Sequence, residues 1–166
     1  MDNNARTVGK ALVRHGVLIM LFGAFVAGMG YEVSIVDTFD EAHKAQWKTA
    51  HIGTCMQSLL LLAAAAVCSL LDLGPSEWSV YRLAVVLTGW GNSLGYTVGA
   101  FVGHRGLTPV CGTMESPIIL SICESGPPLN VFVNGLFVIA MVAIIPALGL
   151  MFIGACRDRA TGKKTK

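Results

Sequence analysis

The chain has 166 residues, of which 54% are hydrophobic and 13% are charged, and its formal net charge is +2. Soluble domains carry about 25% charged residues, so this composition indicates an integral membrane protein of one domain, residues 1–166. The basic residues gather near the two ends of the chain, and this pattern argues against a nucleic-acid-binding surface, which needs a basic stripe along a folded face.

Four apolar segments follow one another along the chain, at residues 13–36, 51–71, 80–103 and 131–156. Each is close to the roughly 20 residues that cross ~30 Å of hydrocarbon as a helix. A backbone in lipid must satisfy its own hydrogen bonds, so we expect an all-α bundle of four membrane-spanning helices. Residues 157–166 form a basic tail.

The distribution of Lys and Arg predicts the orientation. Nine of the twelve lie in the N-terminal segment, the second loop and the C-terminal tail. Cytoplasmic loops carry an excess of Lys and Arg, so both termini are predicted to be cytoplasmic. An even number of spans agrees with this orientation.

The three connections differ in character. Residues 37–50 are polar and are expected to be partly helical, with Trp47 as an interfacial anchor. Residues 72–78 are short, so the second and third spans should be antiparallel neighbours. Residues 104–128 form the longest loop, and loops of that length are often functional. Its Cys111 and Cys123 are either two free thiols or, in an oxidising compartment, a disulfide.

Glycines recur at four-residue spacing in the third span, at Gly91, Gly95, Gly99 and Gly103. Such a ridge lets two helices approach closely in a membrane. The glycines either serve packing alone or leave room for a flat ligand beside Trp90.

Polar side chains inside the spans gather in one half of the membrane. His51 and Gln57 lie in the outer part of the second span, and Asn92 and Tyr96 lie at a similar depth in the third. His15 belongs to the other half. Polar groups in a bilayer are costly and tend to mark sites. His51 is either an interfacial, hydrogen-bonded histidine or a metal or heme ligand, and Asn92 and Tyr96 are either interhelical hydrogen bonds or part of a site.

The sequence lacks the motifs of several common metal and heme sites. There is no HExxH, CxxC or CxxCH, so a structural zinc site and a c-type heme are unsupported. A single neutral imidazole can still be the axial ligand of noncovalent heme. The acidic residues lie almost entirely in loops, which disfavours a transporter that uses membrane carboxylates.

Three segments of the sequence resemble the styrene oxide isomerase family. They are Arg14-His15-Gly16 before the first apolar run, Trp47-Lys-Thr-Ala50-His51-Ile-Gly53, and Trp90-Gly-Asn92-Ser-Leu-Gly-Tyr96 continuing to Phe101 and Arg105-Gly106-Leu107. The likeness covers the first three spans, and the fourth matches only in being hydrophobic. The long loop with two cysteines departs from the family pattern.

The resemblance implies a small four-helix membrane enzyme that assembles as a homotrimer with ferric heme b between subunits. Its reaction would be the Meinwald rearrangement of an aryl or other apolar epoxide to an aldehyde or ketone. His51 would be the axial iron ligand, and Tyr96 and Asn92 would line the substrate pocket. Gln57 stands where the family tends to have an asparagine. Three residues near the same interface are candidate partners of the heme propionates: Arg105, Lys48 and His43.

The sequence is also compatible with two other functions. One is a non-catalytic membrane heme protein or electron carrier, which would need a reducible heme and a redox partner. The other is a structural four-span protein whose glycines only pack helices.

Overall fold

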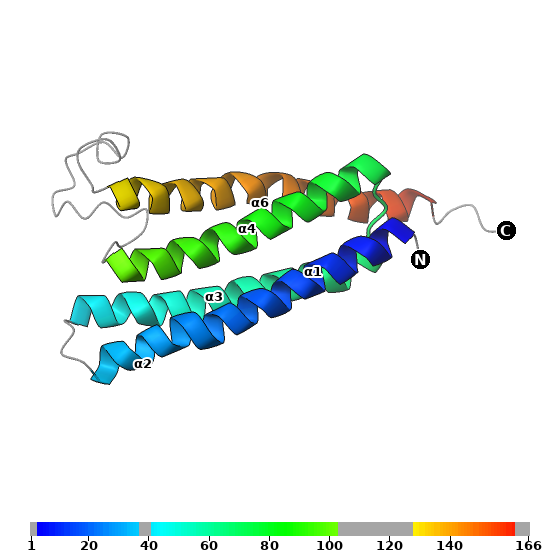
Figure 1. Cartoon of the computed structure of the whole chain (residues 1–166). Coiled ribbons are helices and arrows are strands. Elements are labelled where there is room, and N and C mark those ends of the chain that lie inside the picture. The colour runs from blue at the N-terminus through cyan, green and yellow to red at the C-terminus, as the bar shows by residue number, and fades with distance from the viewer. Residues whose placement is uncertain (1–2, 37–40, 103–127, 162–166) are drawn as a thin grey trace.

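The protein is a bundle of long helices (Figure 1). The computed structural model describes residues 3–36, 41–102 and 128–161, and these contain no strand. The expected all-α fold is therefore confirmed. The elements in chain order are α1 (Asn3–Phe22), the π-helical turn η1 (Gly23–Ala27), α2 (Gly28–Val36), α3 (Glu41–Val67), the 3₁₀ turn η2 (Cys68–Leu70), α4 (Pro75–Val102) and α6 (Pro128–Thr161).

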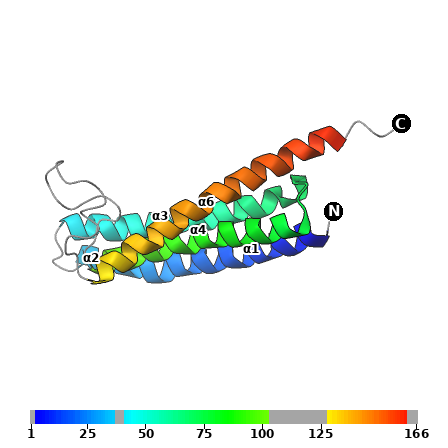
Figure 2. The ribbon, with the colours of Figure 1, turned by 90° about the horizontal axis from the view of Figure 1, so that it is seen from above.

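The segments α1, η1 and α2 continue one another as a single rod, which lies beside α3 (Figure 1). The helix α4 contacts α1, α3 and α6, whereas α6 packs chiefly on α4. Figure 2 shows α6 crossing the other helices obliquely. The start of α1 and the end of α6 lie at the same end of the bundle.

Within the described residues, three helices are long and apolar enough to cross a membrane, namely Asn3–Val36, His43–Leu70 and Val131–Arg157. This finding fits a membrane protein. The predicted span at 80–103 also forms a helix, α4, of 28 residues. It is less apolar because it carries the polar residues Asn92, Ser93 and Tyr96, and its neighbours on three sides cover much of its surface.

The helices extend beyond the apolar segments. The helix α3 begins at Glu41, ten residues before His51, so that residue lies roughly 15 Å along the helix at 1.5 Å per residue. The helix α6 continues to Thr161, so the predicted basic tail begins as helix. Trp47 was expected to be an interfacial anchor, but its side chain is only 4% exposed. It packs on Gly30 of α2 and edge-on against Phe101 of α4.

The predicted role of glycines in packing is confirmed at the positions whose contacts are described. A Cβ on Gly91 would lie 3.0 Å from the carbonyl oxygen of Leu136, and one on Gly95 would lie 3.0 Å from the ring of Phe137. These two glycines therefore let α6 approach α4. Gly16 of α1 is similarly close to the side chain of Leu62 on α3. Gly103, the last glycine of the predicted ridge, lies outside the described residues.

A polar contact fixes α4 to the end of α6. Gly74 precedes Pro75, a residue preferred at the first helical position. The backbone N–H of Gly74 donates to Oε2 of Glu77 at 2.7 Å, which satisfies a free donor at the helix start. The guanidinium of Arg157 donates to the same carboxylate at 2.6 and 3.0 Å.

Candidate active site

His51 on α3 is hydrogen-bonded to the backbone of the neighbouring rod. Its Nδ1 lies 3.0 Å from the carbonyl oxygen of Gly23. A carbonyl oxygen only accepts, so Nδ1 carries the proton and donates it. In the neutral ring, Nε2 then holds the free lone pair. No second hydrogen bond of His51 is found among the described residues.

The carbonyl that accepts from His51 belongs to the π-helical turn. In η1 the backbone N–H of Gly28 donates to the oxygen of Gly23, five residues back. Single π turns are wider than α turns and occur frequently at functional sites. The oxygen of Gly23 thus accepts two hydrogen bonds, one that closes the turn and one from His51.

Glycines on the rod leave space for the side chains of His51 and Thr54 on α3. A Cβ on Gly28 would lie 3.3 Å from Nδ1 of His51, and a Cβ on Gly23 would lie 2.9 Å from Cγ2 of Thr54. Side chains at these positions would hold α3 away from the rod. The ring of Tyr31, one turn further along α2, is nearly parallel to His51, with centroids 6.5 Å apart and 11° between the planes.

His51, Cys55 and Ser58 lie on the face of α3 that contacts α1 and η1, as their helical spacing requires. The hydroxyl of Ser58 donates to the carbonyl oxygen of Gly16 at 2.7 Å, on the same rod that His51 contacts. A Cβ on Gly23 would lie 3.4 Å from the sulfur of Cys55. This face of α3 is therefore used to hold α1 and η1.

Tyr96 lies between α3 and α6. A Cβ on Gly53 would lie 2.8 Å from ring atoms of Tyr96, so the ring rests on the α3 backbone at a glycine. On its other side, Phe137 of α6 meets it edge-on at a centroid distance of 5.1 Å. Two helices thus fix the ring of Tyr96, and the structure shows no hydrogen bond from its hydroxyl to a described residue.

The register of α3 and α4 brings Gln57 and Asn92 to one level. These antiparallel helices meet where Gly53 rests on Tyr96 and where Leu61 rests on Gly89. Gln57 is midway between the two contacts on α3, and Asn92 is close to midway on α4. The candidates Gln57, Asn92 and Tyr96 therefore lie within about one helical turn of one another along the bundle, without a hydrogen bond among their side chains.

Unpartnered polar atoms are buried at the same level. Buried polar groups in proteins are nearly always hydrogen-bonded, so these exceptions need an explanation. Thr54, Ser93 and Thr97 are almost fully buried. Four side-chain oxygens at this level have no hydrogen-bond partner among the described residues: Oγ1 of Thr54, Oε1 of Gln57, Oγ of Ser93 and Oγ1 of Thr97. This group of polar atoms could receive the polar part of a bound molecule.

The sequence places His15 in the other half of the membrane, whereas the structure places it close to the level of Asn92, because its partner Trp90 is only two residues before Asn92. The indole Nε1 of Trp90 donates to Nδ1 of His15 at 3.2 Å, and the ring of Phe22 packs on Trp90 at 6.0 Å. His15 and Trp90 thus form an internal contact between α1 and α4.

The structure describes two of the three predicted partners of the heme propionates, Lys48 and His43. Lys48 is exposed on α3, three residues before His51. His43 lines a groove of about 550 Å³ with Trp47 and Phe101 near the same end of the bundle. Arg105 lies outside the described residues, as do Cys111 and Cys123.

His51 fits a cofactor that needs one protein ligand. Metal-bound histidines usually donate their other ring N–H to a carbonyl or carboxylate, as His51 does to Gly23. Among the described residues, no three His, Cys, Asp or Glu side chains come together as they would around a metal ion. The donor set therefore suits heme iron with a single axial imidazole better than a multidentate metal site.

Several residues of this region were not predicted as members of the site. Tyr31 lies beside His51, but the spacing of polar residues in the sequence did not indicate this contact. Thr54, Ser93 and Thr97 belong to no motif, and their orientation toward the interior depends on packing. The π turn leaves no recognisable signal in the sequence, although the glycines at its start and just after it are consistent with close packing.

Comparison with known proteins identifies the family. The family model described as styrene oxide isomerase matches residues 8–156, which include most of the rod Asn3–Val36, all of α3 and α4, and most of α6. The match thus extends into α6, beyond the three segments that carry the resemblance in the sequence. No curated protein and no solved structure matched the chain. The chain belongs to the styrene oxide isomerase family.

Proposed function

We propose that this protein is a membrane isomerase that converts an aryl or other apolar epoxide to an aldehyde or ketone, with ferric heme b held by His51. Membership of the family supports the reaction class. The hydrogen bond from Nδ1 of His51 to Gly23 is the observation that carries the cofactor assignment, because it leaves Nε2 for iron. The proposal includes a homotrimer with heme between subunits and both termini in the cytoplasm.

The reaction is an isomerisation and needs no co-reactant. One C–O bond of the epoxide breaks at the carbon that better supports positive charge. A hydride then moves to that carbon from its neighbour, where the remaining C–O bond becomes C=O. Bound ferric heme supplies a Lewis acid for the epoxide oxygen. No electron is gained or lost overall, so no redox partner is required.

The side chains of Tyr96, Asn92 and Gln57 would hold the epoxide oxygen in this proposal. A phenol and two amides are hydrogen-bond donors but not strong bases, and a hydride shift needs no base. Tyr96 is well suited to positioning because Gly53 and Phe137 fix its ring. Orientation of bound reactants can contribute a large part of a rate enhancement.

The surroundings of these residues would exclude water. Ile19 and Leu61 are fully buried at Gly89, next to the proposed pocket. A closed apolar site prevents side reactions of unstable intermediates. Here the side reaction is capture of the cationic carbon by water, which would give a diol. Lys48 and Arg105 are the proposed partners of the heme propionates.

An absorption spectrum of the detergent-purified protein tests the cofactor. We expect a Soret band that disappears in His51→Ala and persists in His15→Ala, the matched change at the other membrane histidine. A protein that purifies without colour and still rearranges epoxides would exclude the heme role.

Product analysis with styrene oxide tests the reaction. The expected product is the aldehyde, without diol and without any added reductant. A heme-loaded protein that leaves the epoxide unchanged, but is reduced and reoxidised by a partner, would favour an electron carrier instead.

A further inference from the structure

The bundle carries a second groove, far from His51, at the end where α1 begins. It lies between α1 and α3 and has a volume of about 720 Å³. It is lined by three cations, by small and apolar residues and by one hydroxyl: Arg6, Lys10, Arg14, Ala5, Gly9, Val13, Leu62, Ala65, Ala66, Cys68 and Ser69. We infer that this groove binds an anionic phospholipid, with the phosphate on the cations and an acyl chain along the apolar part.

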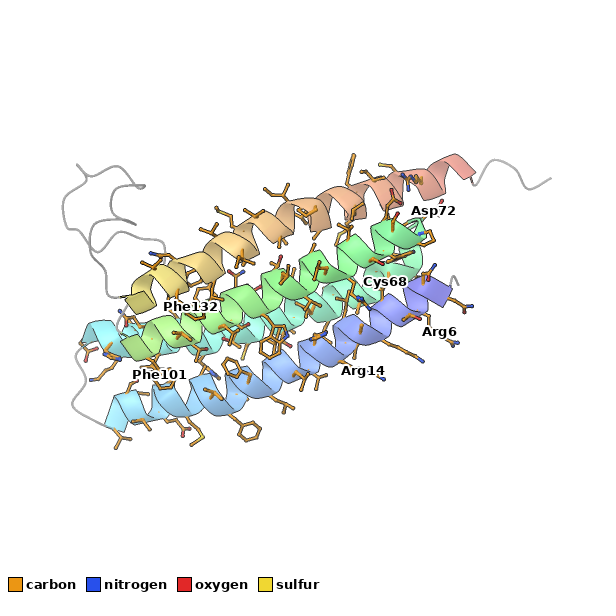
Figure 3. The ribbon with its side chains drawn as sticks, turned by 45° about the horizontal axis from the view of Figure 1, so that its top comes forward. Arg6, Arg14, Cys68, Asp72, Phe101 and Phe132 are labelled. Carbon is orange, nitrogen blue, oxygen red and sulfur yellow. The ribbon has the colours of Figure 1, made fainter. Side chains whose placement is uncertain are left out.

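The three cations form one row on α1. Arg6, Lys10 and Arg14 are spaced by four residues, which places them on one face of the helix. Figure 3 shows Arg6 and Arg14 projecting from the same side of α1, away from α4 and α6. None of the three makes an ion pair with a described residue, and no residue lining the groove is acidic. The row therefore lacks an anion from the described part of the chain.

The depth of the row matches the headgroup layer of a membrane. The rod Asn3–Val36 has 34 residues, or roughly 51 Å at 1.5 Å per residue, which exceeds the ~30 Å of hydrocarbon. The stretch free of charged residues starts directly after Arg14 and ends before Glu32. Arg14 thus lies at the edge of the hydrocarbon, and Arg6 lies roughly 12 Å further out. Phosphate groups of lipids occupy this layer.

The apolar part of the groove reaches the edge of the hydrocarbon, at the level of Arg14. A Cβ on Gly9 would lie 3.6 Å from the carbonyl oxygen of Ala65, so the two helices are close there and form the floor. Val13 and Leu62 lie deeper, at the level of Arg14. A ligand that fills both parts must have a charged head and an apolar tail, as a phospholipid has and a free phosphate ion does not.

Two other grooves among the described residues lack this combination. The groove near Trp47 has His43 as its single titratable residue, and the groove between α4 and α6 is lined by apolar residues alone. Anionic lipids are attracted to clusters of Lys and Arg at a membrane surface. The proposal depends on the membrane setting but not on the proposed heme or reaction.

Native mass spectrometry of the full-length protein in detergent tests the site, with phosphatidylglycerol and phosphatidylcholine as probes. We expect phosphatidylglycerol to be retained preferentially and its binding to weaken about fivefold in Arg14→Gln. Arg82→Gln is the matched control, because Arg82 is also exposed, lies near the same end and does not line the groove. It should leave binding unchanged.

A second pair of variants tests the groove without changing charge. Ala66→Trp should fill the apolar part and reduce retention of phosphatidylglycerol, whereas Ala63→Trp, at an exposed position on α3 outside the groove, should not. Equal retention of the two lipids, or equal losses in Arg14→Gln and Arg82→Gln, would overturn the proposal. Complete displacement of the lipid by inorganic phosphate would also overturn it, because the acyl chain would then contribute nothing.

Discussion

His51 and Gly23 are joined across two helical rods by a hydrogen bond of 3.0 Å, and the acceptor is the carbonyl that also closes the π turn. The orientation of the imidazole therefore depends on the backbone of η1 and not on another side chain. This arrangement makes the candidate cofactor ligand sensitive to small changes in how closely the rod approaches α3.

Gly23→Ala should disturb this approach. Its Cβ would lie 2.9 Å from the methyl group of Thr54, so the two rods must separate. Overpacking of this kind costs about 1–3 kcal/mol of unfolding free energy. We expect a lower thermal unfolding temperature and a weaker or shifted Soret band. Gly149→Ala is the control, since nothing lies within 4 Å of its Cβ. Equal behaviour of the two variants would show that the contact at Gly23 is unimportant.

Tyr96→Phe should separate activity from stability. The ring contacts with Gly53 and Phe137 remain, so the unfolding free energy should change by less than about 0.5 kcal/mol. Loss of the hydroxyl should lower kcat by about 10²-fold, because the epoxide oxygen loses its orientation. Tyr81→Phe removes a buried hydroxyl near the carbonyl oxygen of Ala64 and should do the reverse. It should cost about 1 kcal/mol of stability and leave turnover intact. A structural role for Tyr96 would give the same result in both variants.

Gln57→Leu should make the protein more stable and less active. The Oε1 atom of Gln57 is buried without a partner, and an unsatisfied polar atom costs about 1–3 kcal/mol. Leucine removes that cost and also removes the amide that would hold the substrate. Denaturation curves and epoxide turnover measure the two effects. Gln57→Asn keeps the amide and should retain activity. Unchanged turnover in the leucine variant would remove Gln57 from the site.

The ion pair at the start of α4 should make stability depend on pH. The hydrogen bond from Arg157, and secondarily that from Gly74, lower the pKa of Glu77 below its ordinary value of 4.5. A lowered pKa means that the stabilisation is present above the ordinary value and is lost as pH falls through the folded value. Glu77→Gln should thus be less stable than the wild type at neutral pH, with the difference vanishing in acid. Unfolding temperatures across a pH series measure this. Glu41→Gln, whose side chain is 90% exposed, should show little difference at any pH.

Hydropathy predicted the four helices well because apolar length is what a membrane helix needs. The helix before His51 agrees with the expectation that residues 37–50 are partly helical, whereas the continuation of α6 into the basic tail was not predicted, because hydropathy does not count polar segments. The shared face of His51 and Ser58 followed from helical periodicity, which holds within one element. The partners of these residues did not follow, because the acceptors at Gly23 and Gly16 are backbone atoms of another helix.

The buried position of Trp47 was also not predicted from the sequence. Tryptophan is common at membrane interfaces, so its place beside polar residues suggested an anchor. Gly30 and Phe101, which lie far from it in the sequence, create the space that buries it. Contacts of this kind depend on the tilt and register of whole helices, which one sequence does not specify.

The polarity of α4 has a consequence for how the protein enters its membrane. Its polar residues make insertion as an isolated helix unfavourable, since such residues oppose transfer into the bilayer. The short turn at 71–74 holds α4 against α3, which is apolar enough to insert. We expect the two to enter together as a helical hairpin, with α6 closing over the remaining side of α4 afterwards. The polar residues that form the candidate site on α4 would then also make the membrane insertion of α4 depend on α3 and α6.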